Sequence, residues 1–267
     1  MGALNVSPES FHSGSVYRQT GALVDAATAM VEAGAALIDV GARSTAPYLD
    51  TAISEDEETR RLAEAVEALV AKLSVPVSAD TCRFGPARAA LESGARVLND
   101  VHGLRDRELA RLAAAHEVGI IAMAFPEPGG GRRDQHDGSV AATGDVLAAC
   151  LERARRAGIA DERVVLDPGI GFFREGSASW DERDVLVLAG LRQLVKLGRP
   201  LAVGVSRKSF IGAITGRAAT ADRLAGSLAA TALAVMSGAA VIRTHDVPET
   251  IDAVRVAERV LKASDHA

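Results

Sequence analysis

The chain has 267 residues, of which 48% are hydrophobic, 24% charged and 3% aromatic, and its formal net charge is −5 at pH 7. This balance excludes wholesale disorder, and the net negative charge with few rings excludes a nucleic-acid-binding surface. The absence of a secretory segment and of any apolar run of 18 residues leads us to expect a cytoplasmic protein that binds neither membrane nor nucleic acid.

Short β-branched runs alternate along the chain with longer segments in which apolar residues recur three and four apart. The predicted strands are 3–6, 37–40, 76–79, 96–99, 119–123, 164–166, 201–205 and 240–243. The predicted helices are 21–33, 56–73, 85–93, 105–116, 143–157, 182–196, 221–236 and 247–262. Strict alternation predicts a parallel sheet, and eight such units favour a closed (β/α)₈ TIM barrel, formed by residues 1–267 as a single domain.

Local signals mark several boundaries between these elements. Ser54 with Glu57 three residues later is typical of a helix start, whereas Gly34, Gly94 and Gly238 follow segments where a helix must stop. The Gly-rich stretch 126–139 after the fifth strand predicts either a mobile flap or a plain insertion. Because the first strand begins almost at residue 1 without a lead-in, we expect the chain to be short at its N-terminus.

Polar residues stand at the carboxyl ends of most predicted strands. In order they are Asn5, Asp39, Asp80, Asn99 with Asp100, Asp167, Ser206 with Arg207 and Lys208, and Arg243 with His245 and Asp246. Any one of them could simply cap a helix or accept loop amides. Barrel enzymes place their chemistry at this end of the strands, so the set as a whole predicts a binding mouth.

The residue types in this set suit a flat heterocycle rich in N–H groups. A carboxylate such as Asp80 or Asp167 pairs with an amidine-like edge through two parallel hydrogen bonds, and Lys208 can donate to a ring carbonyl. Arg243 can stack on a ring or bind phosphate oxygens. Asn5 could add a Mg²⁺ contact, because Mg²⁺ takes few protein oxygens and keeps most of its waters.

These residues lie in segments that resemble the dihydropteroate synthase family. The segments, in family order and spacing, are LNVSPESF (4–11), LIDVGARSTAP (37–47), VSADT (77–81), LNDVHG (98–103), LDPGIGFF (166–173), GVSRKSFIG (204–212), GSLAATA (226–232) and IRTHDVPET (242–250). The pair LDPGIGF and SRKSFIG is the specific part of the match, whereas the other segments are weak alone. The resemblance covers nearly the whole chain.

The resemblance implies a transferase of folate biosynthesis, in which 6-hydroxymethyl-7,8-dihydropterin diphosphate loses diphosphate and 4-aminobenzoate takes its place. It implies that the pterin is held by Asp80, Asn99, Asp167 and Lys208, with Arg243 stacked on it and Phe172 lining the pocket. It further implies that Asn5 with Mg²⁺, and Arg243 with His245, receive the diphosphate. Thr45 and Ser209 would border the arylamine site. Family members usually dimerise through late helices, which makes 221–236 a candidate homodimer interface.

Departures from the family pattern fall in the first, second and fifth loops. Ala46 stands where the family has an Arg, and Arg43 stands where it has Glu. The fifth strand ends in Met123-Ala124-Phe125 in place of Met-His, Glu9 replaces an Asp in the first loop, and Arg174 follows PGIGFF where the family has GFGK. These changes leave open a synthase that uses a different arylamine, a sulfonamide-insensitive one, and a paralogue that binds pterin without catalysis.

Three further hypotheses have weaker support in the sequence. Pterin-binding methyltransferase relatives share the Asp and Asn contacts, but the SRKSF segment argues against them. Cys82 has no basic group evidently placed to activate it, so we expect a buried or semi-buried thiol in place of a nucleophile. His102, His116 and His136 lack metal-ligand spacing and are expected to be structural or surface residues.

Overall fold

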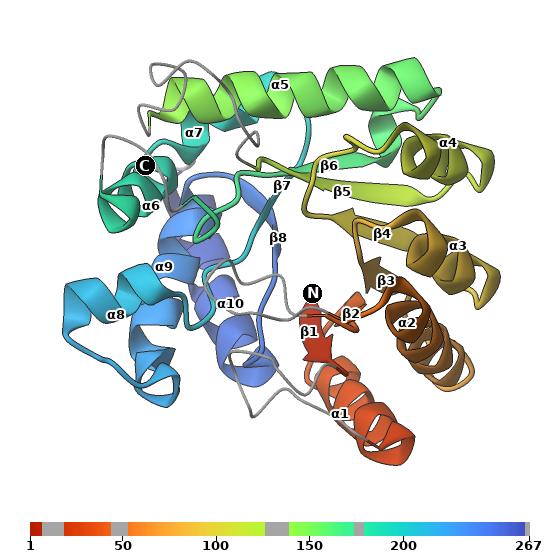
Figure 1. The fold of residues 1–267 in the computed structure, drawn as a ribbon. Coiled ribbons are helices and arrows are strands. Elements are labelled where there is room, and N and C mark those ends of the chain that lie inside the picture. The colour runs from red at the N-terminus through yellow and green to blue at the C-terminus, as the bar shows by residue number, and fades with distance from the viewer. Residues whose placement is uncertain (7–18, 44–52, 126–138, 174–178, 265–267) are drawn as a thin grey trace.

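Eight parallel strands form one sheet in chain order, with the helices outside it (Figure 1). The structure is a computed structural model that describes residues 1–6, 19–43, 53–125, 139–173 and 179–264. The strands are β1 (Gly2–Asn5), β2 (Ile38–Gly41), β3 (Val77–Asp80), β4 (Val97–Asp100), β5 (Gly119–Met123), β6 (Val164–Asp167), β7 (Leu201–Val203) and β8 (Ala239–Ile242). The last strand returns to the first, since Ala3 N donates to Thr244 O at 2.8 Å and Thr244 N donates to Met1 O at 3.0 Å. The predicted TIM barrel is confirmed.

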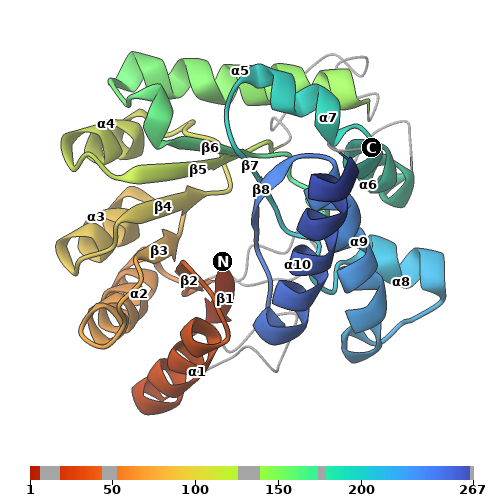
Figure 2. The same ribbon diagram turned by 180° about the vertical axis from the view of Figure 1, so that it is seen from behind.

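The helices follow the strands around the ring, as both views show (Figures 1 and 2). They are α1 (Thr20–Glu32), α2 (Glu55–Val70), α3 (Phe84–Glu92), α4 (Arg107–Ala115), α5 (Val140–Ala157), α6 (Trp180–Ala189), α7 (Leu191–Leu194), α8 (Ser209–Thr215), α9 (Leu224–Met236) and α10 (Val247–Ser264). Among the described helices, none has the length and apolar character that crossing a membrane requires.

Alternation along the strands separates the apolar core from the mouth. On β2, Ile38 and Val40 are fully buried in the hydrophobic core, while Asp39 between them pairs with polar residues of other strands. Side chains of successive strand residues point to opposite faces, so one face of β2 packs under the helices and the other faces the barrel interior. The same sequence therefore supplies both the packing and the inward polar groups.

Helix starts follow their capping residues. Glu57 N donates to Ser54 Oγ at 3.2 Å, which confirms the predicted start of α2. Ala142 N donates to Ser139 Oγ at 3.1 Å, so α5 begins at Val140 rather than at the predicted 143. A side-chain oxygen at the N-cap satisfies an amide that the helix itself leaves unpaired.

The predicted boundaries are wrong in three places around the last part of the ring. Segment 182–196 is not one helix, because the chain breaks at Gly190 between α6 and α7 and ends in a 3₁₀ turn. Strand 201–205 ends at Val203, since the chain then turns toward Arg207, whose φ is +56°. The short helix α8 has no counterpart among the predicted helices, and its seven residues are too few to show a period.

Candidate active site at the carboxyl ends of the strands

The first four strands bring residues at or next to their carboxyl ends to one level. Asn5 lies beside Gly41, Gly41 beside Asp80, and Asp80 beside Asn99 in the sheet register. A Cβ on Gly41 would stand 3.5 Å from both Asn5 Oδ1 and Asp80 Oδ2, so those two side chains approach each other across the glycine. Parallel strands end at the same edge, and here that edge is lined by an amide and a carboxylate from different strands.

A guanidinium from the last strand end ties this group together. Arg243 Nε donates to Asp39 Oδ2 at 2.8 Å, and Arg243 Nη2 donates to Asp80 Oδ2 at 3.0 Å. Asn99 Nδ2 also donates to Asp39 Oδ2, at 3.2 Å. Asp39 is fully buried, and the hydrogen bonds from Arg243 and Asn99 offset the cost of removing its carboxyl group from water. The sequence reasoning placed Asp39 at a strand end but assigned it no role; the signal was a carboxylate inside an otherwise apolar strand.

Burial and the nearby guanidinium of Arg243 change the pKa of Asp80 in opposite directions. Burial, together with the charge of Asp39, raises the pKa of Asp80 to about 7, and Arg243 opposes that rise. A carboxyl group that titrates near neutrality can either accept or donate a hydrogen bond in the mouth, depending on pH.

Asp167 and Lys208 meet through the loop that follows β6. Gly169 N donates to Asp167 Oδ1 at 2.8 Å, and Lys208 Nζ donates to Ile170 O at 2.9 Å. Burial raises the pKa of Asp167, whereas the Gly169 amide and the charges of Lys208 and Arg243 lower it. Lys208 Nζ also lies 4.3 Å from the centre of the Phe172 ring. Asp167, Lys208 and Phe172 thus occupy one side of the same mouth.

The loop after β7 contributes both site residues and supports. Ser206 Oγ lies 3.0 Å from His245 Nδ1, which joins the ends of β7 and β8. Arg207 forms a two-pronged pair with Asp246, at 2.9 and 2.7 Å, and donates to two backbone carbonyls, so its role is structural. Ser209, the first residue of α8, follows Lys208 directly. Thr45 lies outside the described residues, as do Glu9, Ala46 and Arg174.

Asp100 accepts loop amides, as a strand-end carboxylate without a role in binding would. Its two oxygens accept the amides of His102 at 2.8 Å and Leu104 at 2.6 Å. Burial raises the pKa of Asp100 to about 6, and the two amide hydrogen bonds oppose that rise. The carboxylate therefore shapes the β4 loop and is not directed at the mouth.

An apolar wall stands on the β3 to β6 side of the rim. Cys82, Val101 and Met123 form a buried cluster against which Phe125 and Phe172 pack. The expectation that no basic group lies near Cys82 is wrong, because Arg43 Nη2 is 3.4 Å and His102 Nε2 is 3.9 Å from its sulfur. Burial nevertheless raises the pKa of Cys82 to about 12, and the thiol is buried as expected.

Arg43 is directed toward α2 by a buried carboxylate. Glu58 is 1% exposed, and its oxygens pair with Thr81 Oγ1 at 2.6 Å and Arg83 Nη1 at 3.0 Å. Arg43 Nε lies 3.5 Å from Glu58 Oε2. The guanidinium thus sits at the rim between β2 and β3. Within the described residues, no cluster of three His, Cys, Asp or Glu side chains could hold a metal ion.

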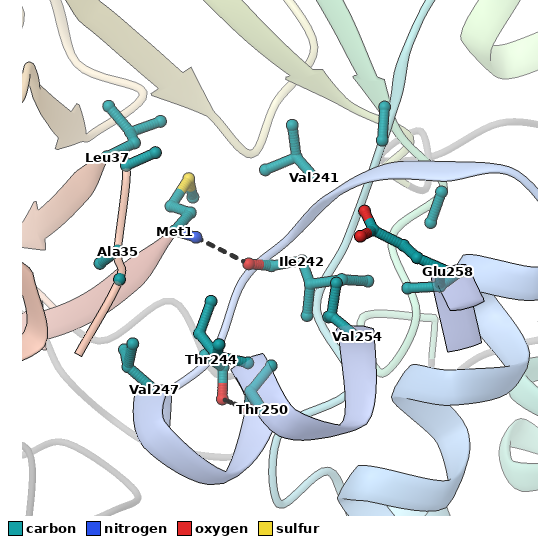
Figure 3. Close-up of a pocket in the computed structure, with 16 residues that line it drawn as sticks. Met1, Ala35, Leu37, Val241, Ile242, Thr244, Val247, Thr250, Val254 and Glu258 are labelled. Carbon is teal, nitrogen blue, oxygen red and sulfur yellow. Dashed lines mark hydrogen bonds between the residues drawn. The ribbon is translucent and has the colours of Figure 1, made fainter. Parts of the chain in front are cut away.

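A separate cavity lies between β8, α10 and the segment before β2 (Figure 3). Its volume is about 280 Å³, and its lining comes mainly from β8, α10 and the segment before β2. The lining is mostly aliphatic, including Leu37, Val241 and Val254, with Glu258 at one side. None of the predicted site residues lines it, so it is distinct from the mouth.

Comparison with known proteins gives consistent matches. The family model described as pterin binding enzyme matches residues 1–245. The chain is 36% identical over 270 residues to dihydropteroate synthase of Escherichia coli (strain K12), which covers 100% of this chain and 93% of that protein. It is 39% identical over 261 residues to a probable bifunctional folylpolyglutamate synthase/dihydropteroate synthase of Haloferax volcanii, covering 96% of this chain but only 30% of that longer protein.

Solved structures match over the same extent. Xanthomonas albilineans dihydropteroate synthase with 4-aminobenzoic acid superposes with a TM-score of 0.86 at 38% identity, covering 98% of this chain and 92% of that one. The same enzyme in complex with 7,8-dihydropteroate gives a TM-score of 0.84 at 36% identity, with the same shares of both chains covered.

Proposed function

The chain belongs to the pterin-binding dihydropteroate synthase family, and we propose on that premise that it joins 6-hydroxymethyl-7,8-dihydropterin diphosphate to 4-aminobenzoate, giving 7,8-dihydropteroate and diphosphate. The observation that carries this proposal is the convergence of Asp39, Asp80 and Asn99, from three strands, with Arg243, which follows β8, in one hydrogen-bonded group. Such a group is built to hold a flat, nitrogen-rich ring at the mouth of the barrel.

The pterin ring is held by acceptors and one cation. Asp80 and Asp167 accept its N–H groups, Asn99 adds an amide, and Lys208 donates to a ring oxygen or nitrogen. Arg243 covers the ring or approaches the diphosphate, and its contact with Asp39 keeps the guanidinium at the rim. The aromatic face of Phe172, which lies beside Lys208, closes the apolar side of the pocket. These roles rest on the positions of the side chains and on the family pattern.

The transfer needs positioning and charge stabilisation more than a strong base. The bond between the pterin methylene and the diphosphate oxygen breaks, and its electron pair leaves with the diphosphate. The lone pair of the neutral arylamine forms the new C–N bond, and the amine then releases one proton to solvent. Arg243 and His245 stabilise the departing charge, and Ser209 and Thr45 border the amine.

We further propose that Mg²⁺ acts with the diphosphate. The side-chain oxygen of Asn5, at the end of β1 beside Asp80, fits as a single protein ligand for an ion that keeps most of its waters. When bound there, Mg²⁺ would neutralise charge on the leaving diphosphate.

A homodimer is part of the same proposal. Helices α9 and α10 pack on each other and carry exposed aliphatic side chains, including Leu233 at 57% and Val256 at 65% exposure. Apolar side chains exposed to this degree on adjacent helices favour a contact with a second copy. Sedimentation velocity tests the dimer. The cytoplasmic location and the single domain over 1–267 stay predictions.

A diphosphate-release assay tests the function. The protein is incubated with dihydropterin diphosphate, Mg²⁺ and one of three additions: 4-aminobenzoate, another arylamine, or no amine. Release only in the presence of 4-aminobenzoate supports the proposal, and release with other arylamines alone would assign a different acceptor. Binding of dihydropterin without any release would favour a binding-only protein, which the replacement of loop residues by Ala46 and Ala124 makes a real alternative. Asp167→Asn should abolish dihydropterin binding.

A further inference from the structure

The loop after β6 adopts a backbone that needs outside support. Gly169 and Gly171 have φ values of +69° and +86°. A Cβ on Gly169 would stand 2.2 Å from Ala124 O, so the loop lies directly against the end of β5. Among the residues that the structure describes, one register pair, Leu166 with Leu201, joins β6 to β7. The sheet therefore does little to hold this loop on its other side.

Two site residues depend on the course of this loop. Gly169 N donates to Asp167 Oδ1 at 2.8 Å, which orients the carboxylate. Ile170 O accepts from Lys208 Nζ at 2.9 Å, and the Lys208 stem passes so close to Gly171 that a Cβ there would be 2.8 Å from Lys208 Cδ. A shift of the loop backbone by about 1 Å would therefore move both charged groups of the mouth.

A buried ion pair on α6, Arg183 with Asp184, is hydrogen-bonded to the backbone of the loop after β6. Arg183 donates to Gly169 O and to Pro168 O, each at 3.3 Å, and its guanidinium carbon lies 3.5 Å from the centre of the Phe173 ring. Asp184 Oδ1 accepts from Gly171 N at 2.8 Å and from Arg183 Nη1 at 3.3 Å.

Both side chains of this pair lie away from solvent. Arg183 is 4% exposed and Asp184 is fully buried. Burial lowers the pKa of Arg183 to about 10, which leaves it charged at neutral pH. Removing two charges from water costs free energy of folding, and an apolar pair would fill the same space without that cost. Three of their hydrogen bonds go to Pro168, Gly169 and Gly171 in this one loop, and Arg183 Nη2 also donates to Thr143 Oγ1 at 3.3 Å. An apolar pair would lack these hydrogen bonds.

We propose that Arg183 and Asp184 are positioning residues for the pterin site: they fix the backbone of 168–171 and through it aim the Asp167 carboxylate and the Lys208 ammonium. The proposal rests on the proposed function for its ligand. Arg183 is suited to the task because its planar fork reaches two carbonyls and a carboxylate at once, which a lysine cannot do.

The test compares Arg183→Met and Arg183→Lys with Leu69→Ala as a matched control. Leu69 is fully buried near the end of α2, so its variant loses stability without touching the loop. Dihydropterin binding is measured with 6-hydroxymethyl-7,8-dihydropterin as the probe. Arg183→Met should weaken binding about tenfold or more, and Arg183→Lys less, while Leu69→Ala binds as the wild type does. KM for dihydropterin diphosphate should rise, and KM for 4-aminobenzoate should stay unchanged.

Amide hydrogen exchange supplies a readout that needs no ligand. The peptide that contains Gly169 and Gly171 should lose protection in both Arg183 variants and keep it in Leu69→Ala. Unchanged protection, or an equal rise of both KM values, would overturn the proposal. If the wild type neither binds dihydropterin nor releases diphosphate while the exchange result holds, the proposed function fails and the support of the loop by Arg183 stands. Should Arg183→Met not fold, Arg183→Lys carries both measurements.

Discussion

Replacing Arg243 by Met removes the charge that holds Asp39 and Asp80 while keeping an aliphatic stem of similar length. Arg243 lies 2.8 Å from Asp39 and 3.0 Å from Asp80, and the side chains are 23%, 0% and 9% exposed. Leaving such carboxylates without their partner costs about 3 to 5 kcal/mol of the free energy of unfolding. We expect a loss of this size at pH 8.5, measured by urea denaturation with the wild type in parallel.

The loss should depend on pH in a defined direction. Arg243 lowers the pKa of Asp80, which is about 7 in the wild type, so the variant holds its proton to higher pH. A folded-state pKa above the unfolded value near 4 means that stability falls as pH rises between the two. Above pH 7 this fall continues in the variant alone, at about 1.4 kcal/mol per pH unit. The difference between variant and wild type should therefore be about 1 to 2 kcal/mol smaller at pH 6 than at pH 8.5.

Arg155→Met is the matched control, because Arg155 forms the same kind of two-pronged pair with Asp161 at 2.9 and 2.7 Å, but on the surface. That variant should change stability little at either pH, since exposed pairs contribute little. A loss below about 1 kcal/mol for Arg243→Met at pH 8.5, or a loss that is the same at both pH values, would refute the view that Arg243 neutralises buried carboxylates.

Three further predictions concern the mouth. Dihydropterin affinity, followed by fluorescence titration, should fall as pH drops below about 7, because protonation of Asp80 replaces a charged acceptor oxygen with an O–H donor and weakens its pairing with ring N–H groups; Asp80→Asn should bind more weakly with a flatter profile, and a flat wild-type profile would contradict this. Iodoacetamide at pH 8 should modify Cys82 at least about 100-fold more slowly in the native protein than in urea, since its pKa is raised to about 12; mass spectrometry showing equal rates would refute an inert thiol. Gly171→Ala should weaken dihydropterin binding, because a φ of +86° and a Cβ 2.8 Å from Lys208 Cδ force the lysine to move, whereas Gly158→Ala, with open space around its Cβ, should bind normally.

The sequence by itself determined the order and type of most elements. Hydrophobic period and caps are local properties, so the alternation of strand and helix and the start of α2 at Ser54 could be read directly. The same holds for the polar strand ends, because a parallel barrel brings every carboxyl end to one rim. Predicted boundaries went wrong where no local period exists, as in the seven residues of α8.

Only the tertiary structure decided which polar groups meet. Arg243 and Asp39 are 204 residues apart, and nothing local in either strand shows that they pair. Arg183 and Asp184 look like ordinary charged positions on an amphipathic helix, yet both are buried against the loop after β6. The polar residues at the strand ends could be predicted because the alternation of strand and helix is a property of neighbouring residues. The pairing of Arg243 with Asp39 could not, because it arises when β8 returns to β1 and the ring closes. The contacts of Arg183 and Asp184 could not either, because they arise when α6 packs against the loop after β6.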